Sequence, residues 1–281
     1  MKFVVLLLSL AAVIGFAIFV LNSQSDQNPA EGGMRLPSAQ EPRGLEITER
    51  LARNILASLS AQAGVRGSGF DDSTTTYAAG NLGDERTPVL IIGATEPLTD
   101  FSGRQNKATI VVVRVLNEAG EYEEIGRVQY EELLRSAPEL NELQDLTGDG
   151  TQELFMSLGY GGASNAAYGF FRVDMQEKKL EWVQLRDQAD QMRNAEFLMG
   201  GTVTHTETVQ VLDLNLDGKK EIVELFTQIW EPSGQENDIP SKQTGETWCL
   251  ARAYRWSGSF FDFDRALSEQ FLVNLGPDCA M

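Results

Sequence analysis

The stretch Asp213-Leu-Asn-Leu-Asp-Gly-Lys-Lys-Glu221 places oxygen-bearing side chains at alternate positions and a glycine where the backbone must turn sharply. A hard cation such as calcium takes about six to eight oxygen ligands. The side chains of Asp213, Asn215, Asp217 and Glu221, with the carbonyl of Lys219, can surround one point at this spacing. An apolar segment follows at once. The stretch therefore predicts a calcium loop that leads into a strand.

A second stretch, Asp145-Leu-Thr-Gly-Asp-Gly-Thr-Gln-Glu153, follows the same rule, D-x-[TN]-x-D-G-x-x-E. The hydroxyl of Thr147 replaces the amide of Asn215 and is a weaker oxygen donor. Asp, Asn and Gly also favour ordinary solvated turns, which is the alternative interpretation of both loops. Two copies with the same internal offsets favour calcium.

A decayed third copy lies earlier in the chain, in Asn81-Leu-Gly-Asp-Glu-Arg-Thr-Pro-Val89. Its Asp84 precedes Asp149 by 65 residues, and Asp149 precedes Asp217 by 68. Gly80 and Pro88 stand where the other copies have their first aspartate and their final glutamate. We therefore expect this copy to bind no metal.

Each loop is followed by two β-forming segments separated by a polar connection. The first segments are residues 89–93, 154–159 and 222–229, and the second are 108–116, 167–173 and 248–256. Their alternation and turn spacing are typical of a β-meander. Three units with one period predict an array or propeller. The expected fold class is all-β with one or two helices, built from repeated β-meander units (about 65–140, 141–205 and 206–281) in a propeller-like or open propeller-type array.

Two helices are expected beside the strands. Ile47, Leu51, Ile55 and Leu59 recur four apart, which gives residues 45–63 one apolar face. A shorter helix is predicted to start at Tyr130 and to end before Pro138.

The N-terminus differs from the rest of the chain. Residues 3–21 carry no charge and form a segment about as long as a membrane span. Lys2 precedes this segment and acidic residues follow it. We expect a signal anchor or transmembrane helix at residues 1–22, a flexible linker at 23–44, and an extracytoplasmic domain at 45–281, in the periplasm or at the cell surface. Cleavage after residue 25 is the alternative and would give a secreted body.

The net charge is −18, from 41 acidic and 23 basic residues. This balance argues against nucleic acid as a partner, because phosphate binding needs clustered Lys and Arg. Only two cysteines occur, Cys249 and Cys279. In an exported protein such a pair is expected to form a disulfide. The alternative is two unconnected buried thiols.

The acidic loops resemble those of the FG-GAP/VCBS repeat family, whose units supply blades of integrin-α-type β-propellers. In that family the loop acids bind calcium and stiffen the blade, and the propeller face binds partners. The resemblance implies two ligand sets: Asp145, Thr147, Asp149, Thr151 and Glu153, then Asp213, Asn215, Asp217, Lys219 and Glu221. Three units are fewer than the about four to eight blades of a closed propeller. A further degenerate blade, an open array, or a ring shared by two chains would each account for this.

Two other functions fit the sequence less well. Asp213 to Glu224 fits the EF-hand pattern, but its flanks are rich in β-formers rather than helix-formers. The single histidine, His205, has no catalytic motif around it. The sequence thus predicts a membrane-anchored binding protein with calcium as a structural cofactor, whose partner is an envelope or extracellular protein or a glycan. An exported hydrolase that acts on polysaccharide or phosphoester through an acidic cleft is the alternative.

Overall fold

The computed structural model describes residues 47–62, 75–83, 86–95, 106–132, 136–160, 165–202, 204–276 and 279. The expected anchor at residues 1–22 and the linker at 23–44 lie outside the described residues. None of the described helices combines the length and the apolar character needed to cross a membrane.

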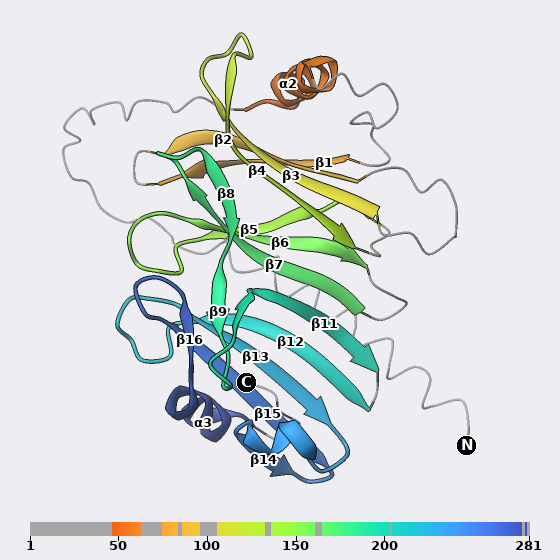
Figure 1. Cartoon of the computed structure of the whole chain (residues 1–281), viewed down its shortest axis with the longest axis vertical. Coiled ribbons are helices and arrows are strands. Elements are labelled where there is room, and N and C mark those ends of the chain that lie inside the picture. Colours follow the sequence, from red (N-terminus) through yellow and green to blue (C-terminus); the bar gives the residue numbers. More distant parts are fainter. Residues whose placement is uncertain are drawn as a thin grey trace, which may run out of the picture. The chain divides into compact units, whose positions relative to one another are not determined.

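Strands make up most of the described chain, which confirms the all-β class with two helices (Figure 1). In chain order the elements are α2 (Glu49–Gln62), β1 (Thr75–Leu82), β2 (Thr87–Thr95), β3 (Asn106–Val115), β4 (Tyr122–Glu132), β5 (Glu139–Gln144), β6 (Glu153–Tyr160), β7 (Asn165–Asp174), β8 (Lys179–Trp182), β9 (Gln184–Arg186), β10 (Met192–Asn194), β11 (Glu196–Thr202), β12 (His205–Leu212), β13 (Glu221–Gln228), the 3-10 helix η1 (Gly234–Asp238), β14 (Ser241–Thr244), β15 (Thr247–Trp256), β16 (Phe261–Asp264) and α3 (Arg265–Asn274).

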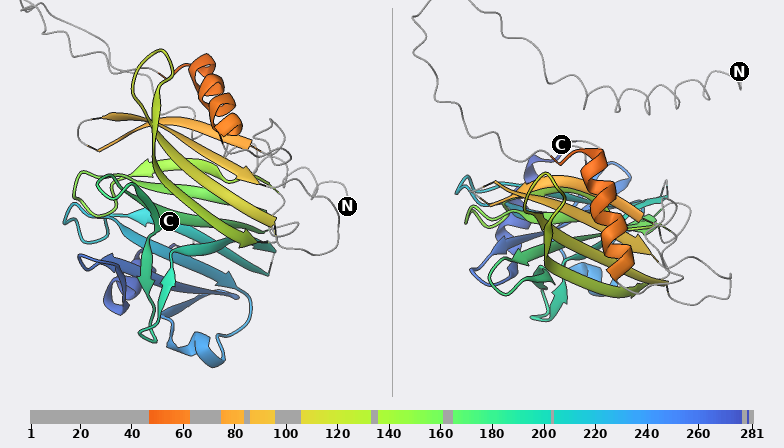
Figure 2. Two further views of the ribbon diagram at one scale, coloured as in Figure 1. Left: turned by 45° about the horizontal axis from the view of Figure 1, so that its top comes forward. Right: turned by 90° about the horizontal axis from the view of Figure 1, so that it is seen from above.

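The first sheet contains β1 to β4 in chain order, all antiparallel. One of its faces is covered by α2, which crosses the strands in Figure 2. The contact is made by the apolar stripe expected from the sequence, with Leu51, Ile55 and Leu59 buried against Leu90 and Val111. The predicted helix is therefore confirmed, and its apolar face packs on the β-body.

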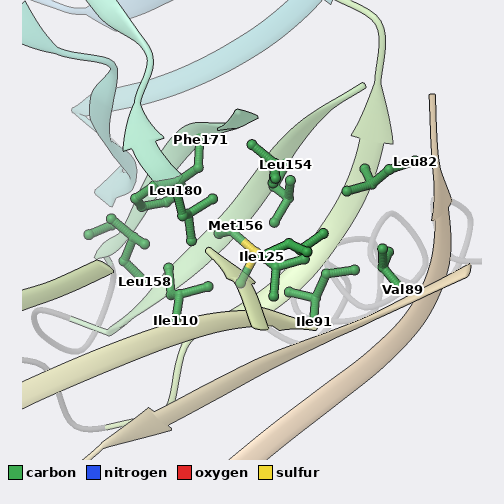
Figure 3. Packing of buried hydrophobic residues seen from close by; sticks show 13 residues of the cluster. Leu82, Val89, Ile91, Ile110, Ile125, Leu154, Met156, Leu158, Phe171 and Leu180 are labelled. Carbon is green, nitrogen blue, oxygen red and sulfur yellow. The ribbon is translucent and has the colours of Figure 1, made fainter. Parts of the chain in front are cut away.

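The other face of the first sheet packs on β6, β7 and β8 through the cluster shown in Figure 3. Ile91, Ile110 and Ile125 from the first sheet meet Met156 and Phe171 from the second, all at 1% exposure or less. Two four-stranded meanders, β1–β4 and β5–β8, thus share one core.

The third unit is attached differently. The second sheet has the order β10-β9-β16-β15-β13-β12-β11-β7-β6-β5, and β8 and β14 pair with β7 and β15. In it β11 pairs with both β7 and β12, so the meander β12, β13, β15 and β16 continues the sheet of the second unit beyond β7. Over the described residues neither sheet closes into a ring.

The C-terminal segment covers β13 and β15. Leu267 and Phe271 of α3 pack on Val223 and Ala251. Cys249 and Cys279 form the expected disulfide, with an S–S distance of 1.96 Å.

The sequence prediction missed α3, which begins directly after β16 with Asp264 as its N-cap. The helix expected at Tyr130 is wrong, because residues 122–132 form β4.

Gly93 of β2 is a point of close approach between the two sheets. A Cβ atom there would overlap the carbonyl oxygen of Pro138 and lie 2.8 Å from Thr76 Oγ1. We expect Gly93→Ala to lower the free energy of unfolding by about 3 kcal/mol or more, because the backbone carbonyl of Pro138 cannot withdraw as a flexible side chain could. Urea unfolding measures the loss.

Gly80→Ala is the matched control, since its Cβ would meet only the flexible end of Leu143, at 2.5 Å from Cδ1. We expect this change to cost about 1 kcal/mol. Equal costs at Gly80 and Gly93 would contradict the close backbone contact of Gly93 with Pro138.

Candidate metal centre

Both acidic loops occupy the same place in their units. Residues 145–153 connect β5 to β6, and residues 213–221 connect β12 to β13. The decayed copy contains the turn between β1 and β2. Each copy thus joins the first strand of a meander to the second. Strands flank the second loop on both sides, so the EF-hand alternative is wrong.

The two loops are held by matching hydrogen bonds from backbone N–H groups to side-chain carboxylates. The first aspartate accepts from the residue five positions on, the second aspartate from two positions on, and the glutamate from the residue after the first aspartate. In the first loop the donors are Gly150, Thr151 and Leu146, at 2.9, 2.8 and 2.9 Å. In the second they are Gly218, Lys219 and Leu214, at 3.0, 2.9 and 2.7 Å. The two loops therefore share one pattern of hydrogen bonds.

The glycine of the pattern has a conformational reason. Gly150 and Gly218 have φ of 82° and 85°, in the left-handed region that side chains with a Cβ adopt only with strain. This backbone conformation turns the chain so that the N–H groups face the first aspartate.

The two loops also touch each other. The Lys220 N–H donates to the Leu146 carbonyl at 3.0 Å. A Cβ at Gly148 would lie 3.2 Å from Lys219 Cγ. Carboxylates 68 residues apart in the chain therefore lie near each other at the ends of strands of the second sheet. The sequence prediction did not include this proximity.

In the second loop two carboxylates point to one atom. Asn215 Nδ2 donates to Asp217 Oδ2 at 3.2 Å and to Glu221 Oε1 at 3.1 Å. Glu221 is fully buried, and burial raises its pKa despite the hydrogen bond from Leu214. An amide thus lies where two acidic side chains need positive charge. Asp213 is turned instead toward the N–H groups of Asp217 and Gly218, at 3.1 and 3.0 Å.

In the first loop an arginine takes that place. The Arg172 guanidinium, from β7, pairs with Asp149 and lies 3.6 Å from Glu153 Oε1. Glu153 is 1% exposed, and neither its Oε1 nor Thr147 Oγ1 has a hydrogen-bond partner in the described part of the chain. Burial raises the pKa of Glu153 to about 7, against the lowering effects of the Leu146 N–H and Arg172.

These oxygen donors suit calcium, although the carboxylates are not grouped as a finished site. Within the described ranges no three His, Cys, Asp or Glu side chains form a group that could hold a metal ion. A calcium ion would draw on both the acids and the neutral oxygens of Thr147, Thr151 and Asn215, and on the Lys219 carbonyl. The oxygens of Glu153 and Thr147 that take part in no hydrogen bond with the described residues are the observation that best fits a cation.

A pocket of about 540 Å³ opens beside the first loop. Thr147, Thr151 and Glu153 line it from the loop, and Arg172 with Trp256 lines it from the neighbouring strands. The Arg172 guanidinium lies 5.8 Å from the centre of the Trp256 ring. The pocket therefore combines an aromatic wall with polar groups of the loop.

A second pocket, of about 690 Å³, contains a charge cluster that the sequence prediction missed. Glu224, the last acid of the EF-hand pattern, lies 3.0 Å from Arg252 and 3.5 Å from Arg193. Arg193 also donates to the Tyr254 hydroxyl at 2.9 Å, and burial raises the pKa of Tyr254 to about 12. Glu224 and Arg252 are directly opposite each other on β13 and β15, a register that only the strand pairing reveals.

His205, at the start of β12, has structural contacts. Its Nε2 lies 3.0 Å from Glu207, and its ring stacks on Trp230 with 5.6 Å between centres.

No protein-family model, curated protein or solved structure matches this chain.

Glu153 should make the stability of the metal-free protein depend on pH. Its pKa is about 7 in the folded chain against 4.5 for the ordinary side chain. A raised pKa favours the folded state while the group is protonated, so this contribution is complete below pH 4.5 and is lost as the pH rises through 7. Over that pH window the wild type should lose about 3 kcal/mol of its free energy of unfolding, and Glu153→Gln should abolish this loss. Urea unfolding in chelator at pH 5 and pH 8 measures it.

Glu181→Gln is the control, since Glu181 lines the same pocket but is exposed. It should keep the wild-type pH dependence. If Glu153→Gln keeps it as well, the buried carboxylate is not its source.

Proposed function

We propose that this chain is a non-enzymatic binding protein whose repeat loops are stabilised by calcium. We also propose that its three units are FG-GAP/VCBS-type repeats in an open propeller-like array, and that residues 1–22 tether the body on the outer side of a membrane. The observation that carries the proposal is the matched hydrogen-bond pattern of the two acidic loops, each with a buried glutamate.

The role of calcium in this proposal is structural. Six carboxylates, from Asp145, Asp149, Glu153, Asp213, Asp217 and Glu221, belong to two loops in contact. Their mutual repulsion opposes the compact loop geometry, and a divalent cation removes that repulsion. Extracellular calcium modules commonly bind at about 10⁻⁴–10⁻³ M, which suits a protein outside the cytoplasm.

The binding role rests on where the loops lie. Rigid strands position them, and recognition commonly uses loops held in this way. The pocket beside the first loop has Trp182, Trp256 and Arg172 among its lining residues. An aromatic wall with a few polar groups is typical of a ligand site. We propose that the partner, an envelope protein or a glycan, contacts the surface formed by the two loops and this pocket.

A hydrolase is the second candidate, favoured by the raised pKa of Glu153 in a pocket. Acid–base chemistry would need a second available carboxylate. Asp174, in the same pocket, accepts hydrogen bonds from Gln176 and Glu177 in its own turn, and Glu181 pairs with Lys179 at 2.6 Å. Both have other partners, which favours binding over catalysis.

Thermal unfolding of the full chain tests the proposal. Millimolar calcium should raise the melting temperature by about 3–6 °C over chelator, for a dissociation constant of about 10⁻⁴ M. Asp213→Asn with Asp217→Asn should reduce this rise, because the second loop then loses two charges and two anionic ligands.

Asp187→Asn with Asp190→Asn is a matched control. It also removes two charges from an acidic turn, where Asp187 accepts from the N–H groups of Ala189 and Gln191. This variant should keep the full calcium effect. If calcium leaves the melting temperature of the wild type unchanged, the loops are ordinary turns.

A further inference from the structure

The two repeats carry an arginine at the same position, and it has a different partner in each. Phe171 of β7 pairs with Leu154, the residue after Glu153, and Tyr254 of β15 pairs with Ile222, the residue after Glu221. Arg172 and Arg255 come next in each strand. Each arginine is therefore next to the buried glutamate of its own loop.

Arg172 is directed to the loop. It contacts the carboxylates of Asp149 and Glu153, and its side chain is 36% exposed. Arg255 instead forms an ion pair with Asp264 at 3.4 Å. Among the described residues no Lys or Arg forms an ion pair with the acids of the second loop.

The strand register accounts for this difference. Asp264 pairs with Ala253 on β15, two positions before Arg255. In the second unit the residue opposite Phe171 is Trp182. The position equivalent to Asp264 is the next residue, Val183, which has no charge. Glu181, directly opposite Arg172, pairs with Lys179 at 2.6 Å. Arg172 thus lacks an ion-pair partner on the neighbouring strand such as the one that Arg255 has in Asp264.

We propose that Arg172 is the resident cation of the first loop, and that calcium enters this loop by displacing the guanidinium from Asp149 and Glu153. This inference rests on the proposed calcium function and deepens it. A guanidinium and a calcium ion cannot both occupy the space between these carboxylates, since like charges repel. The first loop therefore binds calcium more weakly than the second, and its metal-free form is held together by Arg172.

Displacement also changes the pocket beside the loop. Arg172 is the only Lys or Arg among its described lining residues, and Trp256 is on the same wall. Once calcium holds Glu153, the guanidinium has no acidic partner in the loop and faces the pocket. Calcium in the first loop therefore alters the surface that the pocket presents.

Calcium titration calorimetry on the full chain tests the exchange. Asp213→Asn with Asp217→Asn disables the second loop, so the remaining heat comes from the first. Adding Arg172→Gln to this background should tighten calcium binding about threefold to fivefold, because a competing ion pair is lost. Arg172→Lys keeps a cation beside the loop, so its calcium affinity should stay near that of the same background with Arg172 unchanged. A residue with only a supporting role would weaken binding when replaced, so the sign of the change decides.

Arg255→Gln is the matched control, measured with the first loop disabled by Asp145→Asn and Asp149→Asn. It should change the affinity of the second loop less than twofold, because Arg255 pairs with Asp264. Tighter first-loop binding in Arg172→Gln alone supports the exchange.

The two proposals fail in different ways. Unchanged or weaker first-loop binding in Arg172→Gln, with the wild type still binding calcium, overturns the exchange and leaves the calcium function standing. A complete absence of calcium heat in the wild type and all variants overturns both.

Discussion

The burial of one glutamate in each acidic loop is the constraint that organises this structure. Glu153 and Glu221 are at most 1% exposed, and each accepts the N–H of the residue after the first aspartate. A buried carboxylate costs free energy unless hydrogen bonds and positive charge compensate it. The N–H bond closes the loop, which aligns the first strand of the unit with the second. The remaining lone pairs require a donor or a cation.

Much of the fold could be predicted from local sequence, because strands, loops and α2 have short-range signals. Residues 89–93 and 154–159 lie inside β2 and β6, and all but the last residue of 222–229 lies inside β13. The joining of the second and third units could not be predicted, since it depends on β11 pairing with β7 as well as with β12, the next strand in the chain. Tyr130 was misassigned because a few apolar residues before a proline fit a helix and a strand equally well.

The candidate site was predictable in its residues but not in its surroundings. The pattern of Asp, Asn and Gly marks each loop, because the backbone and the oxygen atoms both depend on that spacing. Arg172, Glu224 and Arg252 carry no such pattern. Their roles come from cross-strand register, and a shift of one residue would place them on the opposite face of the sheet. Charged partners across strands are therefore where sequence reasoning fell short.

The three copies of the loop form a series that follows from the buried acid. In the decayed copy Pro88 replaces the glutamate, and β1 and β2 pair up to Leu82 and Thr87. In the first loop a guanidinium lies beside Glu153, and in the second loop an amide donates to Glu221. An amide supplies a hydrogen bond but no charge, so the second loop retains the largest unmet need for a cation. Dependence on metal should therefore follow the identity of the group that faces the buried glutamate, rather than the count of acidic residues in the loop.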